Sequence, residues 1–486
     1  MAAPQDYFYE SNGVRFDIRD RNNITKAECL ELARAGKDQW NFWRRASPVR
    51  LDETGFNNFA DFSGVDFKND SIDFSDFFFG DHTSFEGARF GNRTLFARSD
   101  IGNWANFSGA VFGFEANFDG ANLGNWANFK RTKFGTIASF MGTQFGNPAS
   151  FDGANFGETT TFRGAQFAGR ASFECAEFEG SVQFCAATWA SISDVYGNLF
   201  SIRRAWAELF DAAPNAFGNI SFDGALFGAT ADFTDRKFLS RASFDSLQRE
   251  KKISPPKTAA SNSNIKPIGP HAFEEITFAA GRRTIFGRTP VFHGCQLRQD
   301  TTFDHAKFPD TSGKGAAARA YRTLKLAFSQ QQAIREEQRF FKLEMQEEAA
   351  SLEPGWKRWL YRRYDYFSDF GFSIWRPLGR LVLLPSLIFG FAYWTLIVLG
   401  NETAMASPLA LKPEFASQWL QFTFANMAPL PDSGLLKELR NNLFGNAVHS
   451  SMVGVFALVL ETTQKLLALI GYFLMGLALR NLFKMK

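Results

Sequence analysis

The sequence predicts a β-solenoid joined to an α-helical membrane module. Three observations favour this fold class: phenylalanine recurs every 11 residues through much of the chain, glycine recurs at a fixed place beside it, and two long apolar stretches lie between residues 378 and 480. A length of 486 residues suits a repeat array with additional parts better than one ordinary core domain.

Composition supports a repeat and excludes several classes of function. The chain has 58 Phe against 11 Trp and 9 Tyr, so one type of apolar position is used repeatedly. A net charge of +3 gives no general field for collecting nucleic acid, and we expect no nucleic-acid partner. The four cysteines form no CxxC pair, which argues against a zinc site or a disulfide scaffold. The first residues show no signal-peptide pattern, so we expect any membrane insertion to come from later segments.

Residues 1–55 are predicted to form an N-terminal helical cap. Thr25 and Glu28 have the spacing of a capping box, and we expect one helix to run from there through Trp40 and Trp43. Such a helix would cover the first coil, whose strand edges and phenylalanine rings would otherwise face water.

Residues 56–310 are predicted to form the Phe-rich solenoid. Eleven phenylalanines at steps of 11 form its core ladder: Phe74, Phe85, Phe96, Phe107, Phe118, Phe129, Phe140, Phe151, Phe162, Phe173 and Phe184. A second apolar column follows five residues later, from Phe79 to Trp189, and the residues two positions before the ladder phenylalanines are mostly small. Glycines after the second column suit corners of the chain. An α-helix is excluded because its apolar stripe needs spacings of 3 and 4.

These residues resemble the pentapeptide repeat family, in which a small residue and a Leu or Phe recur in steps of five. The segments FDGANFGE, FRGAQFAG and FEGARFGN are similar to its Phe-rich variant. The resemblance implies an all-β, right-handed quadrilateral β-helix. Because the steps here alternate between five and six residues, four faces give about 22 residues per coil.

The repeat has three irregularities. Phe56, Phe62 and Phe67 are out of phase with the ladder, which predicts a local insertion near Asn69–Ser71. Residues 190–215 read as a helical insertion, and residues 248–270 as a flexible excursion rich in polar residues and proline. Between and after them the pattern resumes, first at Phe222 and later at Phe286, Phe292, Leu297, Phe303 and Phe308.

Helical segments follow the solenoid. Residues 311–352 are predicted to form one long amphipathic helix, either a C-terminal cap or an oligomerising helix. Residues 353–377 mix aromatic and basic side chains, which is typical of a juxtamembrane segment at the headgroup layer.

Residues 378–486 are predicted to form the membrane module, with spans at 378–399 and about 452–480. Pro385 is expected to kink the first span. In the second, Glu461 and Lys465 lie one helical turn apart and are expected to pair or to face a polar cavity. The basic residues beside both spans place the two termini and the solenoid in the cytoplasm.

Between the spans, residues 413–428 are too short to cross a bilayer and too apolar for a solvated loop, so a re-entrant or interfacial helix is expected. This plan resembles the two-helix pore module of potassium channels in a degenerate form. Its filter position reads Thr-Phe-Ala-Asn-Met-Ala-Pro, which argues against potassium selectivity. The resemblance implies Thr423, Asn426, Met427 and Pro429 as candidate pore or re-entrant residues.

The chain as a whole resembles bacterial pentapeptide repeat membrane proteins with two C-terminal helices, which implies a two-span protein of the bacterial inner membrane. Two functions stay open. One is a homo-oligomeric, channel-like assembly, for which a tetramer is expected, and the other is a membrane-tethered scaffold whose solenoid binds an unknown protein. The family's DNA-mimic topoisomerase inhibitors are a weaker match, because residues 56–190 carry only 15 acidic against 9 basic residues. We find no catalytic motif, metal site or cofactor site, so the sequence does not predict an enzyme.

Overall fold

The structure is a computed structural model, and it describes most of the chain. The described residues are 8–11, 14–17, 24–46, 49–52, 55–57, 59–68, 71–186, 216–217, 219–238, 241–253, 276–293, 295, 297, 301–309, 315–400, 413–428, 434–444 and 452–484. The chain forms two compact units, Met1–Ser312 with Ala316–Phe341, and Gly313–Gly315 with Lys342–Lys486. Each is described by itself.

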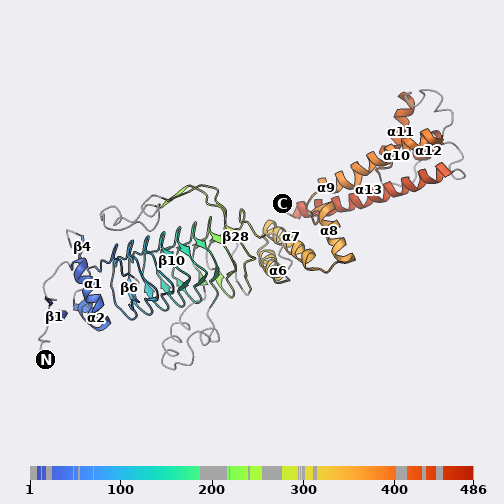
Figure 1. Ribbon diagram of the computed structural model, residues 1–486. Coiled ribbons are helices and arrows are strands. Elements are labelled where there is room, and N and C mark those ends of the chain that lie inside the picture. Colours follow the sequence, from blue (N-terminus) through green and yellow to red (C-terminus); the bar gives the residue numbers. More distant parts are fainter. Residues whose placement is uncertain are drawn as a thin grey trace. The chain divides into compact units, whose positions relative to one another are not determined.

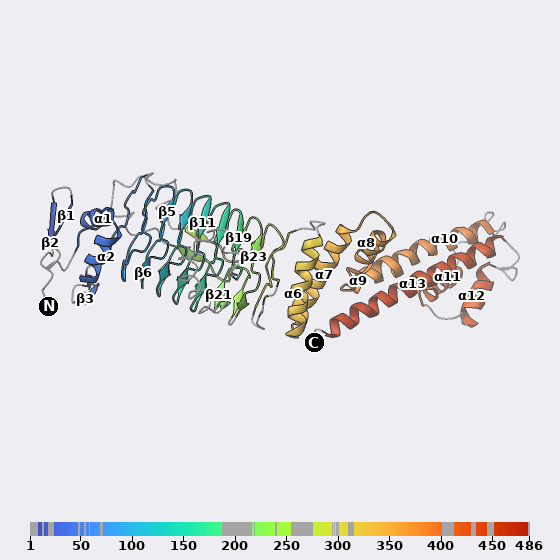
Figure 2. The same ribbon diagram turned by 90° about the horizontal axis from the view of Figure 1, so that it is seen from below.

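The first unit is a parallel β-solenoid with four faces, whose coils stack side by side in both views (Figures 1 and 2). One face holds β10 (Lys133–Phe134), β14 (Asn155–Phe156), β18 (Glu177–Phe178), β22 (Leu226–Phe227) and β28 (Ile285–Phe286). The next holds β5 (Thr94–Leu95), β7 (Ala116–Asn117), β11 (Ile137–Ser139), β15 (Thr159–Thr161), β19 (Ser181–Gln183) and β23 (Ala231–Asp232). A third holds β6 (Asp100–Gly102), β8 (Asn122–Leu123), β12 (Gln144–Phe145), β16 (Gln166–Phe167), β20 (Ala216–Phe217) and β24 (Lys237–Phe238). The fourth holds β9 (Ala127–Asn128), β13 (Ala149–Ser150), β17 (Ala171–Ser172), β21 (Ile220–Ser221) and β25 (Ala242–Ser243).

Successive coils pair residues 22 apart, as the alternation of five and six predicts. Lys133 pairs with Asn155, for example, and the amide of Phe114 donates to Asn92, 22 residues earlier. The first coil departs from this step: Asp61 pairs with Ser84 and Asp66 with Arg89, one residue more than the later step. This difference is the insertion expected near residues 69–71.

The core consists of stacked phenylalanine rings. All eleven ladder phenylalanines are at most 2% exposed. Phe129 lies between Phe107 and Phe151, with ring centroids 4.7 and 4.9 Å away and ring planes within 6° of parallel. Ladder residues 11 apart belong to opposite faces and meet edge to face, as Phe118 and Phe129 do at 5.7 Å. Aromatic pairs favour both arrangements, so a single residue type can fill the core.

The interruptions leave the coil register intact. The expected helical insertion and Trp189 lie in residues 187–215, outside the described residues. In the second column, Phe217 pairs with Phe167 and takes the place that counting 22 residues gives to Trp189. The structure therefore corrects the expected resumption from Phe222 to Phe217. Most of the expected excursion is also outside the described residues, but its start differs from the prediction: β26 (Lys251–Ile253) pairs antiparallel with β27 (Ile276–Phe278).

The N-terminal side of the solenoid carries two helices, α1 (Lys26–Arg34) and α2 (Lys37–Ala46), where one was expected. The predicted capping box between Thr25 and Glu28 is present, but Gly36, at φ +103°, ends the first helix. From α2 the fully buried Trp40 packs on Phe62 and Phe79.

Short antiparallel hairpins accompany this cap. They are β1 (Phe8–Ser11) with β2 (Val14–Asp17), and β3 (Arg50–Asp52) with β4 (Gly55–Asn57). Phe56, which the repeat count placed in the first coil, belongs to β4 instead. The phenylalanine pattern alone does not distinguish a hairpin residue from a coil residue.

The other end of the solenoid is covered by α6 (Gly315–Gln330) and by the first part of α7 (Ile334–Ser351). The expected single helix is wrong, because the chain turns at Gln332, which has φ +58°. That turn lets Phe328 and Phe340 stack at 5.6 Å and meet the ring of Phe303 from the last coil.

The second unit is helical. It contains α8 (Trp356–Ser368), α9 (Trp375–Pro377), a π-helix η1 (Leu378–Leu383), α10 (Leu384–Gly400), α11 (Pro413–Ala425), α12 (Gly434–Phe444) and α13 (Met452–Lys484). Two helical stretches, Trp375–Val398 and Met452–Asn481, are long and apolar enough to cross a membrane. The π-helix lies just before Pro385, whose ring and missing N–H disturb the preceding turn. Gly471 permits close contact there, since a Cβ on it would lie 2.8 Å from Val382.

Candidate functional site

The candidate site lies inside the helical unit, where two short helices pack against the two long ones. Helix α11 contacts α10 and α12, and the buried side chains of Tyr393, Phe422 and Leu439 belong to one apolar cluster shared by these three helices. Polar side chains are enclosed beside this cluster. They form two groups, one ionic and one built around an amide.

The ionic group is centred on Glu461 of α13. Arg440 of α12 binds its carboxylate with two hydrogen bonds, Nε to Oε2 at 2.9 Å and Nη2 to Oε1 at 2.7 Å. Lys465, one turn later on α13, donates to the same Oε1 at 2.8 Å. Glu461 is 1% exposed and Arg440 6%. A carboxylate so deeply buried requires its charge partners, so this group fixes α12 to α13.

The amide group is centred on Gln464, also on α13 and 1% exposed. Its Oε1 accepts from the Tyr393 hydroxyl at 2.9 Å, and its Nε2 donates to Ser386 Oγ and to the Thr423 carbonyl, both at 3.1 Å. One side chain therefore joins α10, α11 and α13. In an apolar surrounding such a network is stable only when its members are satisfied.

The four predicted pore or re-entrant residues are not equivalent. Thr423 is buried, and its hydroxyl donates to the Trp419 carbonyl of its own helix at 2.9 Å. Asn426 is completely buried, and neither its Nδ2 nor its Oδ1 has a hydrogen-bond partner among the residues that the structure describes. Met427 is half-buried, and Pro429 lies outside the described residues. Thr423 and Asn426 are thus enclosed by the chain's own helices.

The predicted pair of Glu461 and Lys465 is present, but sequence reasoning missed its main partner. Arg440 lies in α12, a helix that was not predicted. A signal was available, because Leu436, Leu439 and Leu443 recur at spacings of 3 and 4 and face inward. No comparable signal links Gln464 to Tyr393, since that contact depends on how two distant helices cross.

The described residues offer little for catalysis. Among them no group of three His, Cys, Asp or Glu side chains is placed to hold a metal ion. The four cysteines are unpaired, and burial raises the pKa of Cys29 to about 11 and of Cys175 and Cys295 to about 12. Thiols with such pKa values stay protonated at neutral pH and are poor nucleophiles. The ionic group around Glu461 and the amide group around Gln464 connect helices α10, α11, α12 and α13 to one another.

Comparisons with known proteins identify the repeat. Residues 129–176 and 140–188 match the family model of pentapeptide repeats (9 copies). Searches among curated proteins and among solved structures found no match. The chain therefore combines a pentapeptide repeat solenoid with two helices of membrane-spanning length.

Proposed function

We propose that this protein is a membrane-tethered scaffold: the helical unit anchors it in a bilayer, and the pentapeptide repeat solenoid binds another protein. The anchor would lie in a bacterial inner membrane, with the solenoid and both termini in the cytoplasm. We propose no catalytic role and no cofactor.

The surface of the helical unit supports the membrane assignment. On α10 the side chains of Leu387 and Phe391 are both 70% exposed, and on α13 Phe473 is 65% exposed. Rows of exposed large apolar side chains are unfavourable in water and favourable in lipid. The basic ends of both spans also lie together, because Asn481 donates to the Gly371 carbonyl at 2.9 Å. Arg376, Arg380 and Arg480 thus mark one end of the helix pair, which the positive-inside rule assigns to the cytoplasm.

The observation that carries the scaffold proposal is that the buried polar groups form their hydrogen bonds and ion pairs within one chain. Arg440, Glu461 and Gln464 have partners on neighbouring helices of the same chain, and Lys465 pairs with Glu461 within α13. A pore shared between chains would need polar groups turned outward to a subunit interface. Polar groups that are paired inside the helical unit, together with an apolar outer surface, favour a monomeric membrane anchor.

A channel-like homo-oligomer, with a tetramer as the expected state, is the second candidate, and one observation favours it. Within the described part of the chain the buried Asn426 amide has no hydrogen-bond partner, and such a group has a free-energy cost unless water or an ion satisfies it. Rearrangement of α11 on assembly would supply that contact.

Native mass measurement of the protein in lipid nanodiscs tests the choice. The scaffold proposal expects one chain per disc and no current in planar bilayers, for wild type and for Asn426→Asp alike. A stable tetramer whose conductance changes with Asn426→Asp would reject the scaffold in favour of the channel.

A further inference from the structure

One face of the solenoid carries a continuous polar column beside a column of large side chains. The polar column is formed by residues of the fourth sheet and its neighbouring bridges, of which Ser172 and Ser243 are buried. They are paired coil to coil: Ser84, Asn106, Asn128, Ser150, Ser172, Ser221, Ser243 and Thr302. Two residues before each lies a second column, which begins with His82, Trp104 and Trp126 and later contains Arg170, Asn219 and Arg241. Two hollows lie between these columns on successive coils, one ending at Pro148 and Ser150 and the next beginning at Arg170. We treat them as one groove.

The first part of the groove is aromatic. Trp104 and Trp126 stack at 4.9 Å with their planes within 3°, and His82 continues the stack at 5.8 Å. The two tryptophans are 47% and 51% exposed, in contrast to the buried phenylalanines of the core. Because their ring faces cover one another, they present ring edges and apolar surface to the groove, beside the amides of Asn106 and Asn128.

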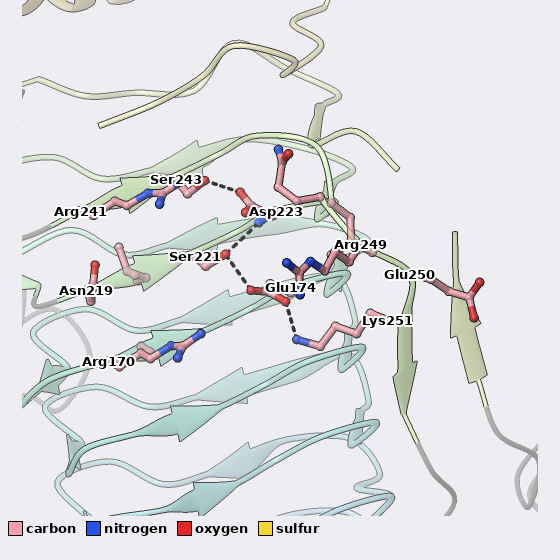
Figure 3. Close-up of a pocket in the computed structure, with 14 residues that line it drawn as sticks. Arg170, Glu174, Asn219, Ser221, Asp223, Arg241, Ser243, Arg249, Glu250 and Lys251 are labelled. Carbon is pink, nitrogen blue, oxygen red and sulfur yellow. Dashed lines mark hydrogen bonds and ion pairs between the residues drawn. The ribbon is translucent and has the colours of Figure 1, made fainter. Parts of the chain in front are cut away.

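The second part is cationic. Arg170 and Arg241 extend from one side of the hollow with Asn219 between them, and Arg249 approaches from the other side (Figure 3). All three arginines are exposed, and none has a side-chain partner among the described residues.

Two acidic side chains of this hollow, Glu174 and Asp223, accept hydrogen bonds from its other residues. Glu174 accepts from Lys251 and from Ser221, Asp223 accepts from Ser243, and Glu250 points away from the hollow (Figure 3). Lys251 also binds Asp152 at 2.8 Å. The lining therefore holds four basic side chains, Arg170, Arg241, Arg249 and Lys251, against three acidic ones, Glu174, Asp223 and Glu250. This is a formal excess of one positive charge, and the three arginines are its exposed cations.

We propose that this groove binds an extended peptide segment of a partner protein, with acidic side chains at the arginines and apolar side chains at the tryptophans. The proposal rests on the scaffold function and specifies its binding surface. A linear groove with apolar and cationic parts suits a polypeptide, which can carry both chemistries along one chain. Alternate residues of an extended peptide lie about 7 Å apart, whereas Arg170 and Arg241 lie two coils apart, about 9.6 Å at the strand spacing. Their long side chains can bridge this difference. Arginine suits carboxylates in particular, because its planar donors bind them in pairs.

The test uses the full chain in nanodiscs of neutral lipid and a fluorescein-labelled 12-residue peptide. One half of the peptide carries Glu at alternate positions, the other half carries Phe at alternate positions, and Ser fills the rest. Fluorescence anisotropy should show saturable binding that weakens with salt. We expect Arg170→Gln with Arg241→Gln to weaken it at least tenfold, and Trp126→Asn to weaken it several-fold without changing the salt dependence.

The matched control is Arg288→Gln, since Arg288 is an exposed arginine outside the groove; this variant should bind as wild type does. Equal binding of a peptide with Gln in place of Glu, or no effect of the double arginine change in a protein with unaltered thermal unfolding, would overturn the proposal. Polyphosphate or phosphatidylglycerol vesicles binding tightly through the same arginines while the peptide does not would also overturn it. Oligomeric state is measured separately, so a conducting tetramer would reject the scaffold function without deciding the peptide site.

Discussion

The buried carboxylate of Glu461 provides a direct test of how the helical unit is held together. Glu461→Leu removes the oxygen atoms that bind the buried Arg440 and the half-buried Lys465, and breaking a buried ion pair from one side costs about 3–5 kcal/mol. Arg440→Met removes the two bonds from α12 to Glu461 and leaves the pair of Glu461 and Lys465 at 2.8 Å, so we expect a smaller loss of about 1–3 kcal/mol. The double variant replaces the main pair with apolar side chains and should be no less stable than Arg440→Met.

The free energy of unfolding is measured by titrating micelle-bound protein with a denaturing detergent and following helix content. Trypsin cleavage after the exposed Lys437 reports separately on the release of α12. Glu438→Gln is the matched control, because Glu438 is exposed on the same helix. The reasoning is refuted if Glu461→Leu matches this control, or if the double variant is as unstable as Glu461→Leu alone.

Three further predictions concern the solenoid and the topology. Phe129→Ala removes a ring stacked on both sides and should cost about 3–5 kcal/mol in thermal or chemical unfolding, whereas the exposed Lys133→Ala should cost little; equal effects would contradict the inward assignment. Burial raises the pKa of Asp119 from 3.8 to about 6, so the folded state binds its proton more tightly and stability should fall as pH rises through about 6. Asp119→Asn should therefore stabilise the protein by up to about 3 kcal/mol at pH 8 and not at pH 3.5, and an equal gain at both values would exclude this cause. A membrane-impermeant thiol reagent should reach a cysteine at the exposed Asn441 in intact cells and not one at Asp304; labelling at Asp304 would reverse the proposed topology.

The solenoid could be predicted from sequence because each coil repeats the same local requirement. A phenylalanine displaced by one residue would point outward, so counting positions was sufficient to place the ladder and to detect the extra residue before Phe74. The count failed after Phe167. It assigned the next position of the second column, 22 residues later, to Trp189, but the structure pairs Phe217 with Phe167. No local sequence signal marks where the chain rejoins the coil.

The helical parts were less predictable for two physical reasons. The breaks at Gly36 and Gln332 depend on a left-handed backbone position, and only the first has a residue type that favours it. The site depends on how separate helices pack against one another, which spacing along the chain does not give. Glu461 could therefore be paired from sequence with its neighbour Lys465 but not with Arg440. Local spacing finds contacts within a helix, and contacts between helices require the fold.

The way the solenoid ends has an evolutionary consequence. Trp40 closes one end and Phe328 and Phe340 close the other, and each contacts only the coils nearest to it. Duplication or deletion of 22 interior residues would therefore leave both ends unchanged and alter the length by one strand spacing, about 4.8 Å. Natural variation in this protein can thus lengthen or shorten the solenoid by one coil at a time. Each step adds or removes one coil of the groove, and the helices that cap the two ends need not change.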